Sequence, residues 1–203
     1  MAGRPRRASD ADIFDAVART VTAHGPDGAT LATIAGQTGL TASALTHRFG
    51  SKHALLVAFA EHAADSAHKV FDSARRRYDD PAEAAVESLL GLMAHLTDRA
   101  SVANNLAFLQ RDLTDPQLAA AAARTSAEIR RGLTELLTQA ADRFTGSAEL
   151  LADDLYTTAA GAQMTWAIDG NGELTDWIRQ RLDRVLARHE HPTGNVPRST
   201  KRD

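Results

Sequence analysis

Residues 30–52, TLATIAGQTGLTASALTHRFGSK, constrain the fold of this chain more than any other stretch. They divide into two short helical segments, and Thr30 and Thr41 stand where each segment needs a side chain to cap its first turn. Between the segments, Gly39 accepts the left-handed backbone conformation that a residue with a Cβ atom resists. The stretch therefore predicts two short helices joined by a tight turn, a helix-turn-helix, over about residues 31–50.

The second of these helices is predicted to have one buried and one exposed face. Leu45 and Phe49 lie four residues apart, so they share the face that holds the helix to the core. The outward face then carries small or polar side chains, which are Ala42, Ser43, Thr46 and His47. Short side chains let a helix backbone sit deep in the major groove of DNA, where hydroxyl and imidazole groups reach base edges or phosphates. At the start of the next helix, Lys52 adds a cation to exposed backbone N–H groups, a combination suited to a phosphate.

The helix-turn-helix stretch resembles the N-terminal domain of TetR-family transcriptional regulators. The residues that carry the resemblance are Ile34, Ala35, Thr38, Gly39, Leu40, Thr41, Leu45, Phe49, Ser51, Lys52 and Leu55. The likeness is sharp over about residues 9–60 and only architectural beyond them. It implies a three-helix DNA-binding unit, followed by a longer connecting helix and an all-helical domain that binds a ligand and forms a dimer.

The sequence departs from the family pattern at Thr46, where these regulators usually carry a tyrosine with a long phenolic reach to a phosphate. Arg48 can supply a backbone contact in its place. The predicted DNA-contacting residues are therefore Thr30, Thr41, Ala42, Ser43, Thr46, His47, Arg48 and Lys52. For Arg4, Arg6 and Arg7 two alternatives stay open, an arm that reaches the adjacent minor groove or a solubilising tail.

The rest of the sequence predicts an all-α fold, because nearly every segment between turn residues has helical rather than strand periodicity. Helices are expected from residue 9 to a turn at 25–28, from 51 to 79, and over about 82–97, 101–113, 115–144, 148–168 and 174–188. We therefore expect a flexible basic arm over residues 1–8 and a helix-turn-helix DNA-binding domain over 9–53. We expect these to be followed by a helical effector-binding and dimerisation domain over residues 54–188 and by a disordered tail over residues 189–203.

Composition and charge narrow the class of protein. Hydrophobic residues make up 43% and charged residues 24% of the chain, as is typical of globular proteins. The formal net charge is -3, yet residues 1–53 hold six Lys or Arg against four Asp, a balance of +2 that leaves -5 on the remainder. A basic N-terminal quarter on an acidic body suits one end that touches phosphate. Without cysteine, a signal-peptide pattern or an apolar run of about 20 residues, we expect no disulfide, no membrane anchor and a cytoplasmic location.

No constellation in the sequence favours an enzyme, a metal site or a cofactor. The closest pairs are His62 with His68, His189 with His191, and Asp153 with Asp154. On a helix the first and third pairs diverge, and the second pair lies in the expected tail. We therefore expect neither catalysis nor a bound metal. Two rival classes stay open, a helical module that binds only protein and, less favoured, a helical enzyme.

The helical body is expected to hold a small-molecule effector and a dimer interface. Apolar walls with a few polar groups suit a small hydrophobic ligand, and the candidates are Met93, Leu96, Asn105, Phe108, Tyr156, Gln163 and Trp166. Small residues beside large ones in the last two helices predict a four-helix seam with a second copy, through Ala159, Ala162, Trp166, Trp177 and Leu182. The expected function is a homodimeric repressor that binds a palindromic DNA operator, leaves it when a ligand binds, and has no membrane partner.

Overall fold

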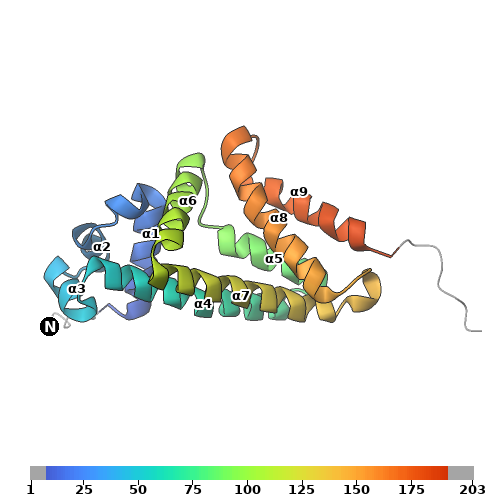
Figure 1. Ribbon diagram of the computed structural model, residues 1–203, viewed down its shortest axis with the longest axis horizontal. Coiled ribbons are helices and arrows are strands. Elements are labelled where there is room, and N and C mark those ends of the chain that lie inside the picture. Colours follow the sequence, from blue (N-terminus) through green and yellow to red (C-terminus); the bar gives the residue numbers. More distant parts are fainter. Residues whose placement is uncertain (1–7, 192–203) are drawn as a thin grey trace, which may run out of the picture.

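The chain folds as a succession of helices. The structure, a computed structural model, describes residues 8–191, so most of the expected arm and tail lies outside the described residues. Over residues 8–191 there are nine α-helices and no strand, which confirms the predicted all-α fold (Figure 1). The helices are α1 (Asp10–Gly28), α2 (Leu31–Thr38), α3 (Ala42–Phe49), α4 (Lys52–Arg77), α5 (Pro81–Met93), α6 (Arg99–Thr114), α7 (Pro116–Thr138), α8 (Ala148–Asp169) and α9 (Leu174–His189), with a 3-10 turn at Ala141–Arg143. Not one of them is both long and apolar enough to cross a membrane.

Capping side chains define where the helices begin. Ser9 Oγ accepts from the backbone N–H of Asp12 at 3.2 Å, and the Asp12 carboxylate accepts from the Ser9 N–H at 2.8 Å, so the two residues form a capping box. The prediction for α6 was wrong, because its cap is Asp98 and Ser101 is its third residue. Ser101 Oγ accepts from the N–H groups of the cap and of the residue before it, at 3.1 and 3.0 Å. It therefore serves the backbone just ahead of the helix.

Three helix ends differ from the prediction. Gly25, with φ 70° and ψ 175°, kinks α1, but one further turn continues to Gly28. α5 ends at Met93, because the chain turns there towards the cap of α6. α7 ends at Thr138, and Phe144 packs into the core of the body beyond the 3-10 turn, where it forms an isolated antiparallel bridge with Glu190.

The hydrophobic core consists of two clusters that meet along α4. We call α1–α3 the head and α5–α9 the body. The body cluster joins α5–α9 to the second half of α4. The head cluster joins α1–α3 to the first half of α4 and also includes Phe108, Leu118 and Ala121, which come from α6 and α7. α4 and α7 run side by side along the molecule, with the head at one end (Figure 1). The head therefore shares its core with the body.

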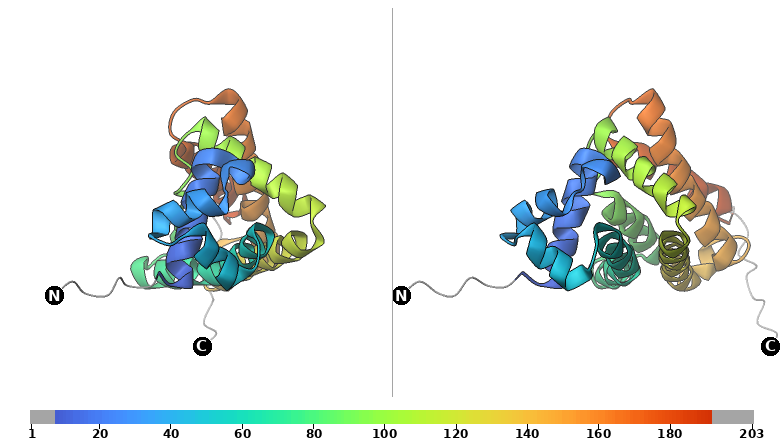
Figure 2. Two further views of the ribbon diagram at one scale, coloured as in Figure 1. Left: turned by 90° about the vertical axis from the view of Figure 1, so that its left-hand side faces the viewer. Right: turned by 60° about the vertical axis from the view of Figure 1, so that its left-hand side comes forward.

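Polar contacts also tie the head to the body. Asn104 Nδ2 on α6 donates to the carbonyl of Thr22 on α1 at 2.8 Å. About two turns further along α6, Arg111 Nη1 forms an ion pair with Asp27 Oδ1 at 3.2 Å. α6 packs against α1, next to which it begins in the right view of Figure 2, so both contacts belong to the same helix pair. Together with the shared cluster, they fix the orientation of the head.

Candidate nucleic-acid interface

The tight turn between α2 and α3 has the predicted geometry. Gly39 adopts φ 69° and ψ 13°, the left-handed conformation that favours glycine. Thr41 Oγ1 accepts from the backbone N–H of Ala44 at 3.1 Å and so caps α3, while Thr30 caps α2 in a reciprocal pair with Thr33. Leu45 is fully buried and anchors α3 in the head cluster. Local capping and one buried side chain thus hold α3 against α2.

α3 presents most of its surface to the outside. Leu45 is its one buried residue, and Ser43, Ala44, Thr46 and His47 are exposed. At about 100° per residue, positions 43 and 47 lie almost opposite position 45, and positions 44 and 46 flank them. Ser43 and His47 therefore form the outermost line of the helix, and Ala42, which is half-buried, lies nearer the core. Sequence reasoning missed Ala44, although the same 100° step would have found it.

The Lys52 ammonium contacts the protein itself. Its Nζ donates to the carbonyl of Pro26 at 2.8 Å and so joins the start of α4 to the end of α1. Burial, followed by the positive charge of Arg111, lowers the pKa of Lys52, and the charge of Asp27 opposes this effect. At the start of α4, Ser51 Oγ accepts from the backbone N–H of Ala54, the third residue of the helix, at 3.0 Å. The predicted phosphate contact of Lys52 stays a prediction.

Arg48 is also held within the protein. Its Nη1 donates to the carbonyl of Ala8 at 2.7 Å, and its Nη2 forms an ion pair with Asp10 Oδ1 at 2.6 Å. These contacts join the end of α3 to the residues that precede and begin α1. The two segments are 40 residues apart in sequence, so no local pattern could have indicated the contact.

A second exposed arginine lies next to the helix-turn-helix. Arg19 Nε on α1 donates to Gln37 Oε1 on α2 at 3.1 Å, and Gln37 Nε2 donates to the buried Thr20 hydroxyl at 3.0 Å. Gln37 thereby orients the Arg19 guanidinium at the edge of α2. Sequence reasoning missed both residues, because their side chains meet only after α1 and α2 have packed together.

The residues predicted to bind a ligand do not line one cavity. Phe108 belongs to the head cluster and makes an edge-on contact with Phe59, with ring centroids 6.0 Å apart, and its predicted ligand contact stays a prediction. The others lie in or against the body cluster or, for Asn105, on α6 beside the junction; they are Met93, Leu96, Asn105, Tyr156, Gln163 and Trp166. Gln163 is only 7% exposed, and its Nε2 has no hydrogen-bond partner among residues 8–191.

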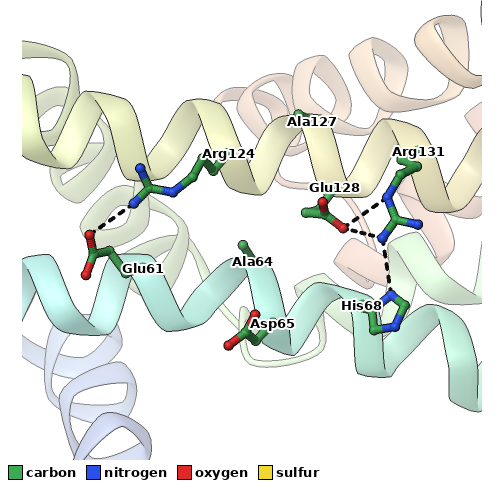
Figure 3. Close-up of a pocket in the computed structure, with 8 residues that line it drawn as sticks. All are labelled: Glu61, Ala64, Asp65, His68, Arg124, Ala127, Glu128 and Arg131. Carbon is green, nitrogen blue, oxygen red and sulfur yellow. Dashed lines mark hydrogen bonds and ion pairs between the residues drawn. The ribbon is translucent and has the colours of Figure 1, made fainter.

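Two surface clefts lie elsewhere. One, of about 450 Å³, runs between α4 and α7. Figure 3 shows the Glu61–Arg124 ion pair at one end of this cleft and Glu128, Arg131 and His68 at the other, with Ala64 between them on α4. The second, of about 460 Å³, lies between α1 and the start of α6. Within the described part of the chain, no group of three or more acidic, histidine or cysteine side chains is arranged to hold a metal ion.

The residues predicted to form the dimer seam face inward. Ala159, Ala162, Trp166 and Leu182 are buried in the body cluster, where they pack α8 and α9 on their own chain, so their side chains are not available to a second copy. Trp177 is partly buried beneath the Arg181 guanidinium, which lies 3.4 Å from its ring centroid. Small residues occur on both faces of α8, and the predicted dimer seam stays a prediction. The outward face of α8 carries Ala160, Gly161, Met164 and Ile168, and Met164 and Ile168 are 52% and 73% exposed.

Comparison with known proteins places these features in a family. Residues 13–59, which span most of the head and the first part of α4, match the model of the tetR family of bacterial regulatory proteins. A search of curated proteins finds no match.

Several solved structures share the fold. A transcriptional regulator from Rhodococcus sp. Rha1 has a TM-score of 0.69 and 22% identity, over 90% of this chain and 96% of that one. A putative regulator from Saccharomonospora viridis in complex with choline has a TM-score of 0.71 and 17% identity, over 89% and 96%. SmeT, the repressor of the Stenotrophomonas maltophilia multidrug efflux pump SmeDEF, has a TM-score of 0.64 and 18% identity, over 97% of each chain. The head therefore matches the model of the tetR family of bacterial regulatory proteins, and most of the chain shares the fold of solved transcriptional regulators.

Proposed function

We propose that the chain is a sequence-specific repressor that acts as a homodimer in the cytoplasm and leaves its operator when a small molecule binds the body. The observation that carries the proposal is the outermost line of α3, where Ser43 and His47 project from a helix whose only buried residue is Leu45. Two such helices, related by a twofold axis, occupy successive major grooves about 34–36 Å apart, which calls for a palindromic operator.

The side chains on α3 divide into two roles. Ser43 and His47 read base edges, since a hydroxyl and an imidazole can each donate or accept a hydrogen bond in the major groove. Thr46 Oγ1 donates to the carbonyl of Ala42 at 3.0 Å, so its hydroxyl keeps only acceptor capacity towards DNA. Lys52 and the N–H groups at the start of α4 take a phosphate, with the Lys52 ammonium exchanging its Pro26 carbonyl for the stronger, charged acceptor.

The outward face of α8 supports a dimer that forms through different residues from those predicted from the sequence. Exposed Met164 and Ile168, with Ala160 and Gly161 between turns, let a second helix approach closely while large side chains fill the gap. In this arrangement the buried side chains of α8 pack within one protomer, and the exposed side chains of α8 contact the second protomer.

The buried amide of Gln163 supports an effector site in the body. A buried donor without an acceptor is costly, and a ligand oxygen that accepts from Nε2 would remove this cost. The choline complex of the Saccharomonospora regulator and the efflux-pump repressor SmeT make small organic molecules a suitable first class of probe. A panel of small organic cations and acids, choline included, is tested for a rise in the midpoint of thermal unfolding. The Gln163→Leu variant should lose that rise.

Selection from a random duplex library tests the DNA-binding role. The full chain should enrich a palindromic sequence, and Ser43→Ala and His47→Ala should each change the preferred bases at defined positions, by roughly 1–3 kcal/mol per position. Gln180→Ala, exposed on α9, is the matched control and should leave the preference unchanged. An enriched sequence that is identical for wild type, Ser43→Ala and His47→Ala would refute base reading by α3.

A further inference from the structure

The cleft of about 460 Å³ between α1 and the start of α6 lies where the head meets the body. Arg19 and Thr22 line it from α1, and Thr97 and Asp98 line it from the segment that leads into α6. Its volume falls within the range of about 300–1,000 Å³ that is common for small-molecule sites. Since one wall belongs to the head and the other to the body, a molecule bound in this cleft would contact both.

The wall on α1 carries a positive charge. Arg19 is exposed, and its Nε donates to the side-chain oxygen of Gln37 at 3.1 Å, which orients the guanidinium without neutralising it. Within residues 8–191, Arg19 forms no ion pair, and its Nη groups donate no hydrogen bond. Two Nη groups side by side match the geometry of a carboxylate. This end of the cleft therefore suits a carboxylate.

The opposite wall carries a negative charge. Asp98 Oδ1 accepts from the backbone N–H of Ser101 at 2.7 Å and so caps α6. Hydrogen bonds from Ser101, chiefly from its backbone, lower the pKa of Asp98, so the carboxylate is ionised at neutral pH. No cation of the described part of the chain forms an ion pair with it. A carboxylate has about four acceptor positions, so the cap leaves capacity for an ammonium group.

The rest of the lining is neutral. Burial lowers the pKa of His95, although a hydrogen bond to the backbone of Leu92 opposes this effect, so the imidazole adds no second charge at pH 7. Ala18, Ala23 and Ala100 supply apolar surface. The cleft therefore offers one positive charge, one negative charge and a short apolar surface, and its two charges do not pair with each other.

We propose that this cleft binds a small amino acid zwitterion, whose carboxylate pairs with Arg19 and whose ammonium pairs with Asp98. A simple anion would be repelled by Asp98 and a simple cation by Arg19, so a molecule that carries both charges is favoured over either. The site is separate from the effector site proposed at Gln163 on α8, and its occupation does not require DNA. A zwitterion held at both ends would connect the head to the body.

Calorimetric titration of the full chain without DNA tests the proposal. The probes are leucine, 4-aminobutyrate and 6-aminohexanoate, which hold their two charges at increasing separations. At least one should bind with a Kd of about 0.1–1 mM, an affinity that about ten heavy atoms can supply. Its amide and N-acetyl derivatives, which each keep one charge, should bind roughly five- to tenfold more weakly. If no zwitterion binds, or if both derivatives bind equally well, the proposal is wrong.

Two variants assign the ends of the ligand. Arg19→Gln should no longer distinguish the zwitterion from its amide, which lacks the carboxylate. Asp98→Asn, which keeps a residue suited to capping α6, should no longer distinguish the zwitterion from its N-acetyl derivative. Arg124→Gln and Asp65→Asn remove the same charges from the cleft between α4 and α7, and these controls should bind as wild type does. An equal loss of affinity in all four variants would overturn the assignment.

Hydrogen exchange locates the bound zwitterion. The amides of residues 18–23 and 95–101 should gain protection when it binds. Protection confined to α8, with binding lost in Gln163→Leu and retained in Arg19→Gln, would place the zwitterion at the effector site of the body and overturn this proposal. If the chain enriches no duplex but binds the zwitterion through Arg19 and Asp98, the proposed function fails and this proposal stands.

Discussion

Replacing Asp112 by asparagine should stabilise the protein at neutral and alkaline pH. Asp112 lies on α6, is 7% exposed, and its Oδ1 has no hydrogen-bond partner within the described residues. Burial, reinforced by the negative charge of Asp115, raises the pKa of Asp112 to about 7. An unfolded aspartate titrates near pH 4, so the folded chain keeps a proton that the unfolded chain has already lost.

The sign and size of the effect follow from this difference. Because the folded pKa is raised, the folded state is favoured at low pH, and that contribution is lost as the pH rises from about 4 to about 7. A shift of roughly three pKa units corresponds to about 4 kcal/mol, which is an upper bound because the residual solvent contact screens the charge. Asparagine has nearly the same shape and no charge, so Asp112→Asn should remove this pH dependence.

Urea unfolding followed by circular dichroism tests the prediction. Wild type and Asp112→Asn are unfolded at pH 5, 6, 7 and 8, at constant ionic strength and protein concentration, since subunit association contributes to stability. The other titrating groups cancel in the difference between the two proteins. The free energy of unfolding of the variant should rise relative to wild type by about 1–3 kcal/mol between pH 5 and pH 8, because this range covers about two of the three pKa units. A difference that stays constant over this range would refute the reasoning.

Three further predictions follow from other parts of the structure. Gly132→Ala should lower the free energy of unfolding by about 1–3 kcal/mol, because the new Cβ would lie 2.5 Å from the Phe71 ring. Gly36→Ala is the control, because its new Cβ would meet nothing within 4 Å, and it should be neutral or stabilising in the same urea titration. Lys52→Ala should weaken binding to all duplexes and reduce the salt slope by about 0.9, and an unchanged slope would exclude a phosphate contact. Ile168→Asp should convert the proposed dimer into monomers in sedimentation velocity while helix content is retained. A variant that still sediments as a dimer would show that the outward face of α8 is not the interface.

The sequence predicted features that depend on neighbours in the chain. The caps by Thr30 and Thr41 are local, and Ser43 and His47 were assigned to the outward face from helical periodicity alone. The sequence does not determine which helices pack against which. Periodicity indicated that Ala159 lies on a packed face, but it does not tell a seam within one chain from a seam between two.

The sequence also does not show which residues distant in the chain come into contact. Phe108 is a large apolar residue on α6 and so was assigned to a pocket of the body, yet α6 also packs on α1, and Phe108 faces the head. Arg48 has the chemistry of a phosphate contact, and only the folded chain brings the Ala8 carbonyl to its guanidinium. Residue type indicated what these side chains can do, whereas the tertiary fold determined which partner each one has.

The shared core of head and body has a consequence for exchange between proteins. Because Phe108, Leu118 and Ala121 complete the head cluster, residues 9–53 do not carry a complete core of their own. A chimera that transplants only the helix-turn-helix would leave apolar surface on the graft and a hole in the recipient. Changing the DNA specificity of such a protein by exchange therefore requires α6 and the first turns of α7 to travel with the head, or else a change confined to the outward residues of α3.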